Sequence, residues 1–324
     1  MGSSLTKLGL FLGLGLIILF GSIFNNQSLA SAVGGELGEH YVFVTKWGSL
    51  GHGNGQFTYA AGIGADALGH IYVVDHGNDR IEKFDSNGKF ITAWGSNGEA
   101  DGHLNQALDI AVYPCGNNLY VADRNNNRIQ MFDSNGTFLR KWGSTGIGNA
   151  QFEYPEGIAV DSRQGNVYVA DTYNNRIQMF DDYGKFITAW GAPGSSNGEF
   201  HYPEGITVDK LGHIYVADHG NDRIEKFDSN GKFITAWGTP GSANGEFNYP
   251  EGIAVDASDS VYVVDHGNDR IEKFDSNGKF MTAWGSLGIS NGQFNKISDV
   301  TVGLAAKVYV SDYGNNNVQV FSLS

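Results

Sequence analysis

The stretch DHGNDRIEKFDSNGKFITAWG, residues 75–95, recurs unchanged at 218–238 and returns at 265–285 with Met281 in place of Ile. Looser copies fill the rest of the chain. Their common mark is a Trp-Gly pair spaced by 47 or 48 residues, at Trp47, Trp94, Trp142, Trp190, Trp237 and Trp284. A fixed period of this length is typical of repeat architectures in which each repeat is one supersecondary unit. The sequence therefore predicts structurally equivalent units of about 47 residues.

Each unit contains four short strand signals separated by turn residues. In one unit they are GIAVD (157–161), VYVAD (167–171), NRIQMFD (175–181) and KFITAWG (185–191). Such β-branched and aromatic runs are typical of strands. The turn DSNG (85–88 in its first copy) joins the third strand to the fourth, and its Asn-Gly pair predicts the positive φ angles of a tight hairpin. No repeat has a helical apolar period, so the fold is expected to be all-β.

The two ends of the repeat region decide between an open array and a closed ring. The last unit stops at VQVFSLS (318–324) and lacks a Trp-Gly strand, whereas the repeat region begins with a lone one, YVFVTKWG (41–48). We expect strand 41–47 to complete the last unit, because a closed ring removes exposed strand edges. The sequence thus predicts a six-bladed β-propeller whose last blade is closed by the N-terminal strand.

Residues 1–32 differ from the repeats and read as a targeting segment. Lys7 precedes an apolar run over residues 8–24, and Ala30-Ser31-Ala32 is a small-residue cleavage pattern. This order is typical of a secretory signal peptide, and an uncleaved membrane anchor through residues 8–24 is the alternative. Either reading predicts that the single domain at 33–324 is secreted or otherwise extracytoplasmic.

Charge and cysteine content exclude several kinds of partner and site. The chain has 324 residues, with 21 Lys plus Arg and 35 Asp plus Glu, for a net charge of −14. Nucleic-acid binding needs a basic surface, so no nucleic-acid partner is expected. Membrane contact is expected only through the N-terminal segment. The single cysteine, Cys115, excludes an intrachain disulfide and a cysteine-based zinc cage.

The units resemble NHL repeats, as in YPEGIAVDSRQGNVYVADTYNNRIQMFDDYGKF (154–186). The resemblance covers residues 41–324. It implies the propeller fold, and the relatives it points to include protein-binding and RNA-binding modules, extracellular sensor domains and a peptide-amidating lyase with a metal in its channel. These activities differ widely, because function depends on sites placed on a fold. The resemblance therefore predicts the fold and leaves the activity open.

An Asp ends the second strand of most units and an Arg follows five residues later. The pairs are Asp75 with Arg80, Asp123 with Arg128, Asp171 with Arg176, Asp218 with Arg223, and Asp265 with Arg270. We interpret them as charge-assisted hydrogen bonds that tie each hairpin. A ring of arginines that binds anions is the alternative. The six tryptophans are likewise interpreted as blade-packing residues.

Positions at which the repeats differ are the candidate ligand site. Three units carry a glutamate at one aligned position near the start of the channel strand: Glu156, Glu204 and Glu251. Two other units carry an aspartate at the next aligned position: Asp109 and Asp299. The position after the strand-terminal Asp, on the same face, holds His219 and His266. Carboxylates with imidazoles could hold Ca²⁺ or another divalent cation, or bind a cationic or polyhydroxylated ligand. The structural alternative is that the glutamates pair only with loop amides or solvent.

Two functions follow from this pattern. The leading hypothesis is a binding scaffold for a protein, peptide or glycan on one ring face. The alternative is a metal-dependent lyase or hydrolase with Glu156, Glu204 and Glu251 as metal ligands or base. In the lyase that the resemblance implies, zinc-binding histidines follow prolines, whereas glutamates follow Pro155, Pro203 and Pro250 here. A three-histidine site is therefore not expected, and no catalytic residue is assigned.

Overall fold

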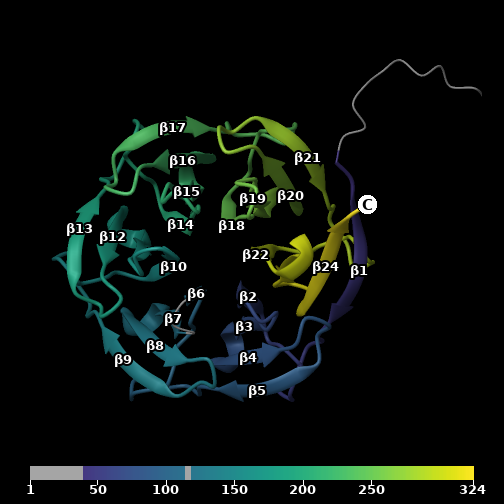
Figure 1. Cartoon of the computed structure of the whole chain (residues 1–324), viewed down its shortest axis with the longest axis horizontal. Helices are drawn as coiled ribbons and strands as arrows, with labels where there is room; N and C mark the ends of the chain where they lie inside the picture. Colours follow the sequence, from purple (N-terminus) through teal and green to yellow (C-terminus); the bar gives the residue numbers. More distant parts are fainter. Residues whose placement is uncertain (1–38, 114–117) are drawn as a thin grey trace, which may run out of the picture. The chain divides into compact units, whose positions relative to one another are not determined.

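The computed structural model describes residues 39–113 and 118–324, which form six four-stranded antiparallel sheets arranged in a ring (Figure 1). The predicted all-β, six-bladed β-propeller is confirmed. The interpretation of residues 1–32 as a signal or anchor falls outside the described residues, as does Cys115. Within the described part of the chain, no helix is long and apolar enough to cross a membrane.

The strands of each blade follow one another from the channel to the rim, so they form four concentric layers. The first strands, which line the channel, are β2 (Ala60–Ala65), β6 (Ile110–Tyr113), β10 (Pro155–Val160), β14 (Pro203–Val208), β18 (Pro250–Val255) and β22 (Ile297–Val302). The second strands are β3 (Ile71–Asp75), β7 (Asn118–Asp123), β11 (Val167–Asp171), β15 (Ile214–Asp218), β19 (Val261–Asp265) and β23 (Val308–Asp312).

The outer half of each blade completes these sheets. The third strands are β4 (Arg80–Phe84), β8 (Arg128–Asp133), β12 (Arg176–Phe180), β16 (Arg223–Phe227), β20 (Arg270–Phe274) and β24 (Asn317–Leu323). The fourth strands are β5 (Phe90–Trp94), β9 (Phe138–Trp142), β13 (Phe186–Trp190), β17 (Phe233–Trp237), β21 (Phe280–Trp284) and, for the sixth blade, β1 (Tyr41–Trp47). We number the blades 1 to 6 in the order of their first strands.

Short 3₁₀ turns connect the second and third strands of the first five blades. They are η1 (His76–Asn78), η2 (Arg124–Asn126), η3 (Thr172–Asn174), η4 (His219–Asn221) and η5 (His266–Asn268). A further turn, η6 (Leu304–Ala306), lies between β22 and β23. Turns η1 to η5 lie on the face where the first strands begin, because the first two strands of each blade are antiparallel. They therefore surround the same end of the channel.

The ring closes through the N-terminal strand, as predicted. β1 pairs antiparallel with β24, with Tyr41 opposite Leu323 and Trp47 opposite Val318 (Figure 1). At the seam with blade 5, the Tyr41 ring stacks on Trp284 with 4.2 Å between ring centroids. Lys273 of β20 binds both Glu39 and the Tyr41 hydroxyl. β1 is thus held by main-chain pairing with β24 and by side-chain packing against blade 5.

The core lies between adjacent blades, and the tryptophans pack there. Trp47 lies against Gly88 of the next blade so closely that a Cβ on this glycine would overlap the indole ring. The same glycine has a φ of +82°, whereas Asn87 does not have a positive φ. The expectation that both residues of the Asn-Gly pair adopt positive φ was therefore wrong. The glycine alone turns the chain, and the neighbouring tryptophan requires it to lack a side chain.

All five Asp–Arg pairs are formed, with Nε–Oδ2 distances of 2.6–2.8 Å. In blade 1, Asp75 is fully buried and also accepts the amide of Thr58. The Arg80 guanidinium donates further to the carbonyl oxygens of His52 and Gly53. Each pair therefore joins the η turn to the loop that enters the blade. The arginine N–H groups stabilise the hairpin through these hydrogen bonds.

The third strands carry a buried polar residue next to this Asp–Arg pair. In blades 1, 4 and 5 it is a glutamate, namely Glu82, Glu225 and Glu272, and each is 0 % exposed. In blades 2, 3 and 6 it is a glutamine, namely Gln130, Gln178 and Gln319, whose Nε2 donates to the strand-terminal Asp at 3.0–3.2 Å. A carboxylate cannot make this donation. Burial raises the pKa of each glutamate to about 7, against the opposing charge of the nearby arginine.

Candidate functional site at the channel mouth

The residue just before the first strand has an unusual backbone conformation in five blades, and in blade 2 the aligned residue, Gln106, lies a few residues before β6. Tyr59, Gln106, Tyr154, Tyr202, Tyr249 and Lys296 all have φ between 49° and 65°. Side-chain-bearing residues rarely adopt this left-handed region, so the surroundings must hold them there. The Tyr154 amide donates to Asn127 Oδ1 of the preceding blade at 2.7 Å, and the Tyr202 amide donates to Asn175 Oδ1 at 2.8 Å. Each blade thus fixes a residue of the next at the mouth.

Six tyrosines lie on the mouth face, four of them in this conformation and two in the turns after second strands. We call them the mouth tyrosines: Tyr59, Tyr154, Tyr173, Tyr202, Tyr249 and Tyr313. The first five are 36–51 % exposed. Their rings contact one another, with centroid separations of 4.6 Å for Tyr59–Tyr313, 4.9 Å for Tyr154–Tyr173 and 5.2 Å for Tyr173–Tyr202. Sequence reasoning missed them. The available signal was the Tyr before each Pro-Glu-Gly motif.

The three predicted glutamates lie together inside this rim. Glu156, Glu204 and Glu251 line a cavity of about 390 Å³ at the mouth, which also contains His76, Arg124, His266 and Lys296. A second cavity of about 240 Å³ lies between the mouth tyrosines Tyr173 and Tyr202 and the side chains of Glu156 and Glu204. Acidic and basic groups therefore share the mouth, which is less uniformly acidic than the list of aligned carboxylates alone indicates.

Each of these glutamates has its own basic neighbour. Glu156 Oε1 accepts Arg124 Nε at 2.7 Å, His219 Nδ1 lies 3.3 Å from Glu204 Oε2, and His266 Nδ1 lies 3.0 Å from Glu251 Oε1. Arg124, on η2, also lies 4.7 Å from the Tyr154 ring centroid. The two histidines are therefore placed where the sequence predicted, and Arg124 adds a partner that the sequence analysis did not assign to the site.

Burial dominates the electrostatics of these pairs. It raises the pKa of Glu156 to about 7, the charge of Glu204 adds to this rise and Arg124 opposes it. Burial also raises the pKa of Glu204. Burial alone lowers the pKa of His266, but the hydrogen bond and charge of Glu251 outweigh it and bring the pKa to about 9. The mouth therefore holds groups whose protonation depends on their immediate partner.

Asp109 and Asp299 lie deeper, where the five predicted carboxylates line one narrow cavity of about 40 Å³. The two aspartate side chains are hydrogen-bonded to each other. Asp109 accepts the amides of Ile110 and Ile158, and Asp299 accepts those of Val300 and Ile63. Burial raises the pKa of Asp109 to about 6 and that of Asp299 as well, so the pair can share a proton. The aspartate oxygens therefore accept hydrogen bonds that link the first strands of adjacent blades.

Glycine occupies the position of Asp109 in most other blades, because the first strands approach closely there. A Cβ on Gly157 would overlap the carbonyl oxygen of Glu204 in the next blade. We expect Gly157→Ala to lower the free energy of unfolding by about 2 kcal/mol or more, because β10 must move away from β14. Chemical denaturation measures this effect. An unchanged denaturation midpoint would contradict the close approach.

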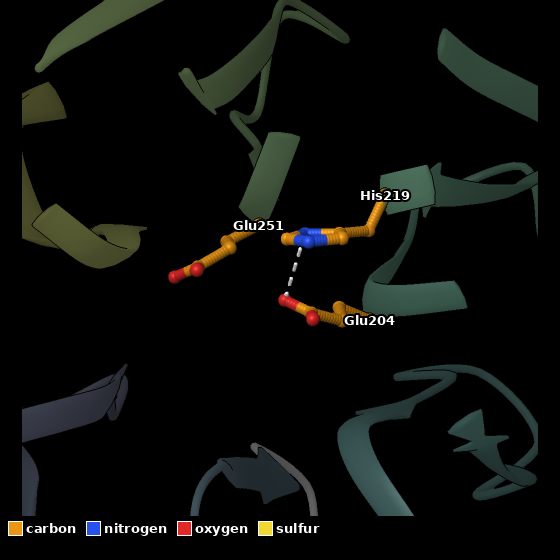
Figure 2. Close-up of side chains that lie close together, drawn as sticks. All are labelled: Glu204, His219 and Glu251. Atoms are coloured by element: carbon orange, nitrogen blue, oxygen red, sulfur yellow. Dashed lines mark ion pairs between the residues drawn. The ribbon is translucent and has the colours of Figure 1, made fainter. Parts of the chain in front are cut away.

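Three side chains of the mouth form a tighter group. Glu204 and Glu251, from β14 and β18, and His219, from η4, each offer a ligand atom, and these atoms all lie within 4.8 Å of one another (Figure 2). Imidazole and carboxylate donors in such a cluster are suited to a divalent metal ion. Glu156 is not a member of this group. It pairs instead with Arg124, and both residues line the cavity of about 240 Å³.

The repeats match a family model over four stretches. The NHL repeat model aligns with residues 104–132, 152–180, 200–227 and 247–274, each of which begins before the first strand of a blade and runs into its third. The chain is a β-propeller with NHL repeats in four of its six blades. The earlier resemblance to this family is thereby confirmed, and the two remaining blades share the architecture of the matched ones.

Solved structures resemble this NHL propeller in fold. A structural genomics protein of unknown function from Bacteroides thetaiotaomicron has a TM-score of 0.69 at 14% identity, over 88% of this chain and 76% of that one. An auxiliary nutrient binding protein from the same organism has a TM-score of 0.66 at 14% identity, over 88% and 77%. A streptogramin B lyase has a TM-score of 0.62 at 13% identity, over 89% and 99%. No curated protein sequence matches the chain. At these identities the likeness shows the fold alone.

Proposed function

We propose that the NHL propeller is an extracytoplasmic binding scaffold whose mouth face holds a peptide segment of a partner protein. The mouth tyrosines carry this proposal. Exposed tyrosines are enriched at the energetic centres of protein interfaces, because they bury a large area at low conformational cost. Contact between these rings and an arginine, as between Tyr154 and Arg124, is a further feature of such centres.

The space beneath the rings supports the same reading. The cavity between Tyr173 and Tyr202 is floored by Arg124, Glu156 and Glu204. An aromatic rim above a few convergent polar groups suits a bound side chain, since the rim excludes water while the polar groups fix orientation. The hydrogen bonds between blades hold the rim in place before a partner arrives, which reduces the entropic cost of binding.

Selection from a random 12-residue peptide library displayed on phage tests this proposal. We expect the purified propeller to enrich peptides that lose at least about tenfold in affinity toward a Tyr173→Ala/Tyr202→Ala variant. Tyr183→Ala is the matched control, because Tyr183 is 65 % exposed in a turn between third and fourth strands, at the opposite end of the blade from the mouth. It should leave binding unchanged.

Two results would count against the peptide assignment. Enriched peptides that bind the double variant as well as the parent protein would show that the mouth tyrosines are not the binding surface. Binding on a glycan array that depends on Tyr173 and Tyr202, without any peptide enrichment, would assign the same surface to sugars.

A second candidate function is a metal-dependent lyase or hydrolase, and the Glu204–His219–Glu251 group favours it. One structural neighbour is named a streptogramin B lyase and another a gluconolactonase from Xanthomonas campestris. These names support the candidate only by analogy of fold. Elemental analysis of protein purified from its host discriminates, because metal-free protein with intact peptide binding would favour the scaffold.

A further inference from the structure

The identical repeats contain an internal comparison at the mouth. The residue after the strand-terminal Asp donates, in several blades, to the main-chain oxygen that begins the first strand of the next blade. His76 Nδ1 lies 3.0 Å from the Ala107 oxygen, and His266 Nδ1 lies 2.8 Å from the Ile297 oxygen. Thr172 makes the same contact with the Pro203 oxygen at 2.8 Å. This bond is a structural feature of the repeat.

His219 departs from this pattern, although the 21 residues around it, 218–238, are identical to residues 75–95. Its Nδ1 atom is buried, makes no hydrogen bond to a main-chain oxygen and lies 3.3 Å from Glu204 Oε2. The ring instead stacks on Tyr249, with 4.9 Å between centroids, and its Nδ1 lies on the side of Glu204 (Figure 2). The His219 imidazole is therefore turned away from the main-chain contact of the other repeats and toward the carboxylates of Glu204 and Glu251.

From this orientation and the ligand spacing we infer that Glu204, His219 and Glu251 bind one divalent transition-metal ion. Their ligand atoms lie within 4.8 Å of one another, so small side-chain rotations bring all of them to metal-bonding distance of one ion. The ion would be held by the His219 imidazole and the Glu204 carboxylate in place of their present contact with each other. Three protein ligands leave a coordination position open toward the cavity of about 390 Å³ that Glu204 and Glu251 line.

The donor set selects the class of metal. Ca²⁺ and Mg²⁺ prefer oxygen-only environments with more ligands than this group offers. An imidazole with two carboxylates suits Zn²⁺ or Mn²⁺. This inference is independent of the mouth tyrosines that carry the proposed peptide binding, whereas the second candidate function requires it. Peptide binding and metal binding can therefore fail separately.

Zinc titration of the tag-free protein, after removal of metals, tests the inference. We expect one Zn²⁺ per chain by calorimetry, with a rise in melting temperature that follows from binding to the folded state. His219→Ala should weaken zinc binding by at least about 100-fold, because it removes a direct ligand. Glu251→Gln should weaken it as well, and circular dichroism checks that both variants are folded.

The chain supplies a closely matched control. His76→Ala removes the same residue from an identical segment, but that histidine pairs with the Ala107 main-chain oxygen, so zinc affinity should stay within about threefold of the parent protein. Failure of the parent protein to bind zinc at about 0.1 mM would overturn the inference, since structural and catalytic sites bind far more tightly. Equal losses in His219→Ala and His76→Ala would overturn it too, because they would indicate nonspecific binding by mouth histidines.

Discussion

Deleting residues 39–47 is expected to abolish the cooperative unfolding of the monomeric propeller. The deletion removes β1, which exposes β24 as an unpaired edge, and it takes away the Tyr41 ring that stacks on Trp284. It also leaves the buried amine of Lys273 without its Glu39 partner. Exposed edges pair with other chains, so the variant should form oligomers or aggregates. Light scattering and differential scanning calorimetry measure both outcomes.

A rearranged chain provides the control for this deletion. Tyr41 lies opposite Leu323, and the Ser324 amide donates to the His40 oxygen at 3.0 Å. A short hairpin turn can therefore join the end of β24 directly to a relocated strand with the sequence of residues 39–47. We expect this permuted protein to recover a monomeric state and a single unfolding transition. A deletion variant that is itself monomeric with an unchanged melting temperature would contradict the role of β1.

The second large effect is a pH dependence of stability that originates in the three buried glutamates. Burial raises the pKa of Glu82, Glu225 and Glu272 to about 7 in the folded protein, above the unfolded value of about 4.5. Their contribution is therefore fully present below about pH 4.5 and is lost as the pH rises through about 7. Each site faces a buried Asp and an Arg, as Glu82 faces Asp75 and Arg80.

Replacement of all three by glutamine should remove this loss. Glutamine already occupies the site in three other blades, where it donates to the strand-terminal Asp. We expect the triple variant to gain on the order of 1 kcal/mol per site at pH 8 and little at pH 5, as measured by urea denaturation at each pH. Gln178→Glu is the reciprocal control and should introduce a loss of stability above pH 7. Parallel pH curves for all variants would refute the assignment.

The fold was predictable because the information about it is repeated. Six Trp-Gly pairs at nearly constant spacing defined the units, and a lone strand at one end matched a missing strand at the other. Closure by strand 41–47 followed from this match together with the cost of exposed edges. The turn geometry was less predictable. The φ of Asn87 depends on the hairpin path, and only the glycine beside Trp47 was constrained.

The site was predictable in position but not in its contacts. Alignment of the repeats placed Glu156, Glu204 and Glu251 at one mouth. It did not reveal that Arg124 binds the first of them. Local sequence also could not separate His219 from His76, because their segments are identical and the difference arises from what the adjoining blade presents. Four of the mouth tyrosines were missed for a similar reason, since their placement depends on a left-handed backbone that residues of the preceding blade hold in place.

The hydrogen bond from the Tyr154 amide to Asn127 bears on how the binding specificity of such propellers diversifies. Because donor and acceptor belong to consecutive repeats, the recognition surface is encoded across repeat boundaries. A mutation of Asn127 would reorient the Tyr154 side chain, which belongs to the next repeat. Transferring a binding specificity from one propeller to another would therefore require a fragment that begins in the middle of one repeat and ends in the middle of the following one.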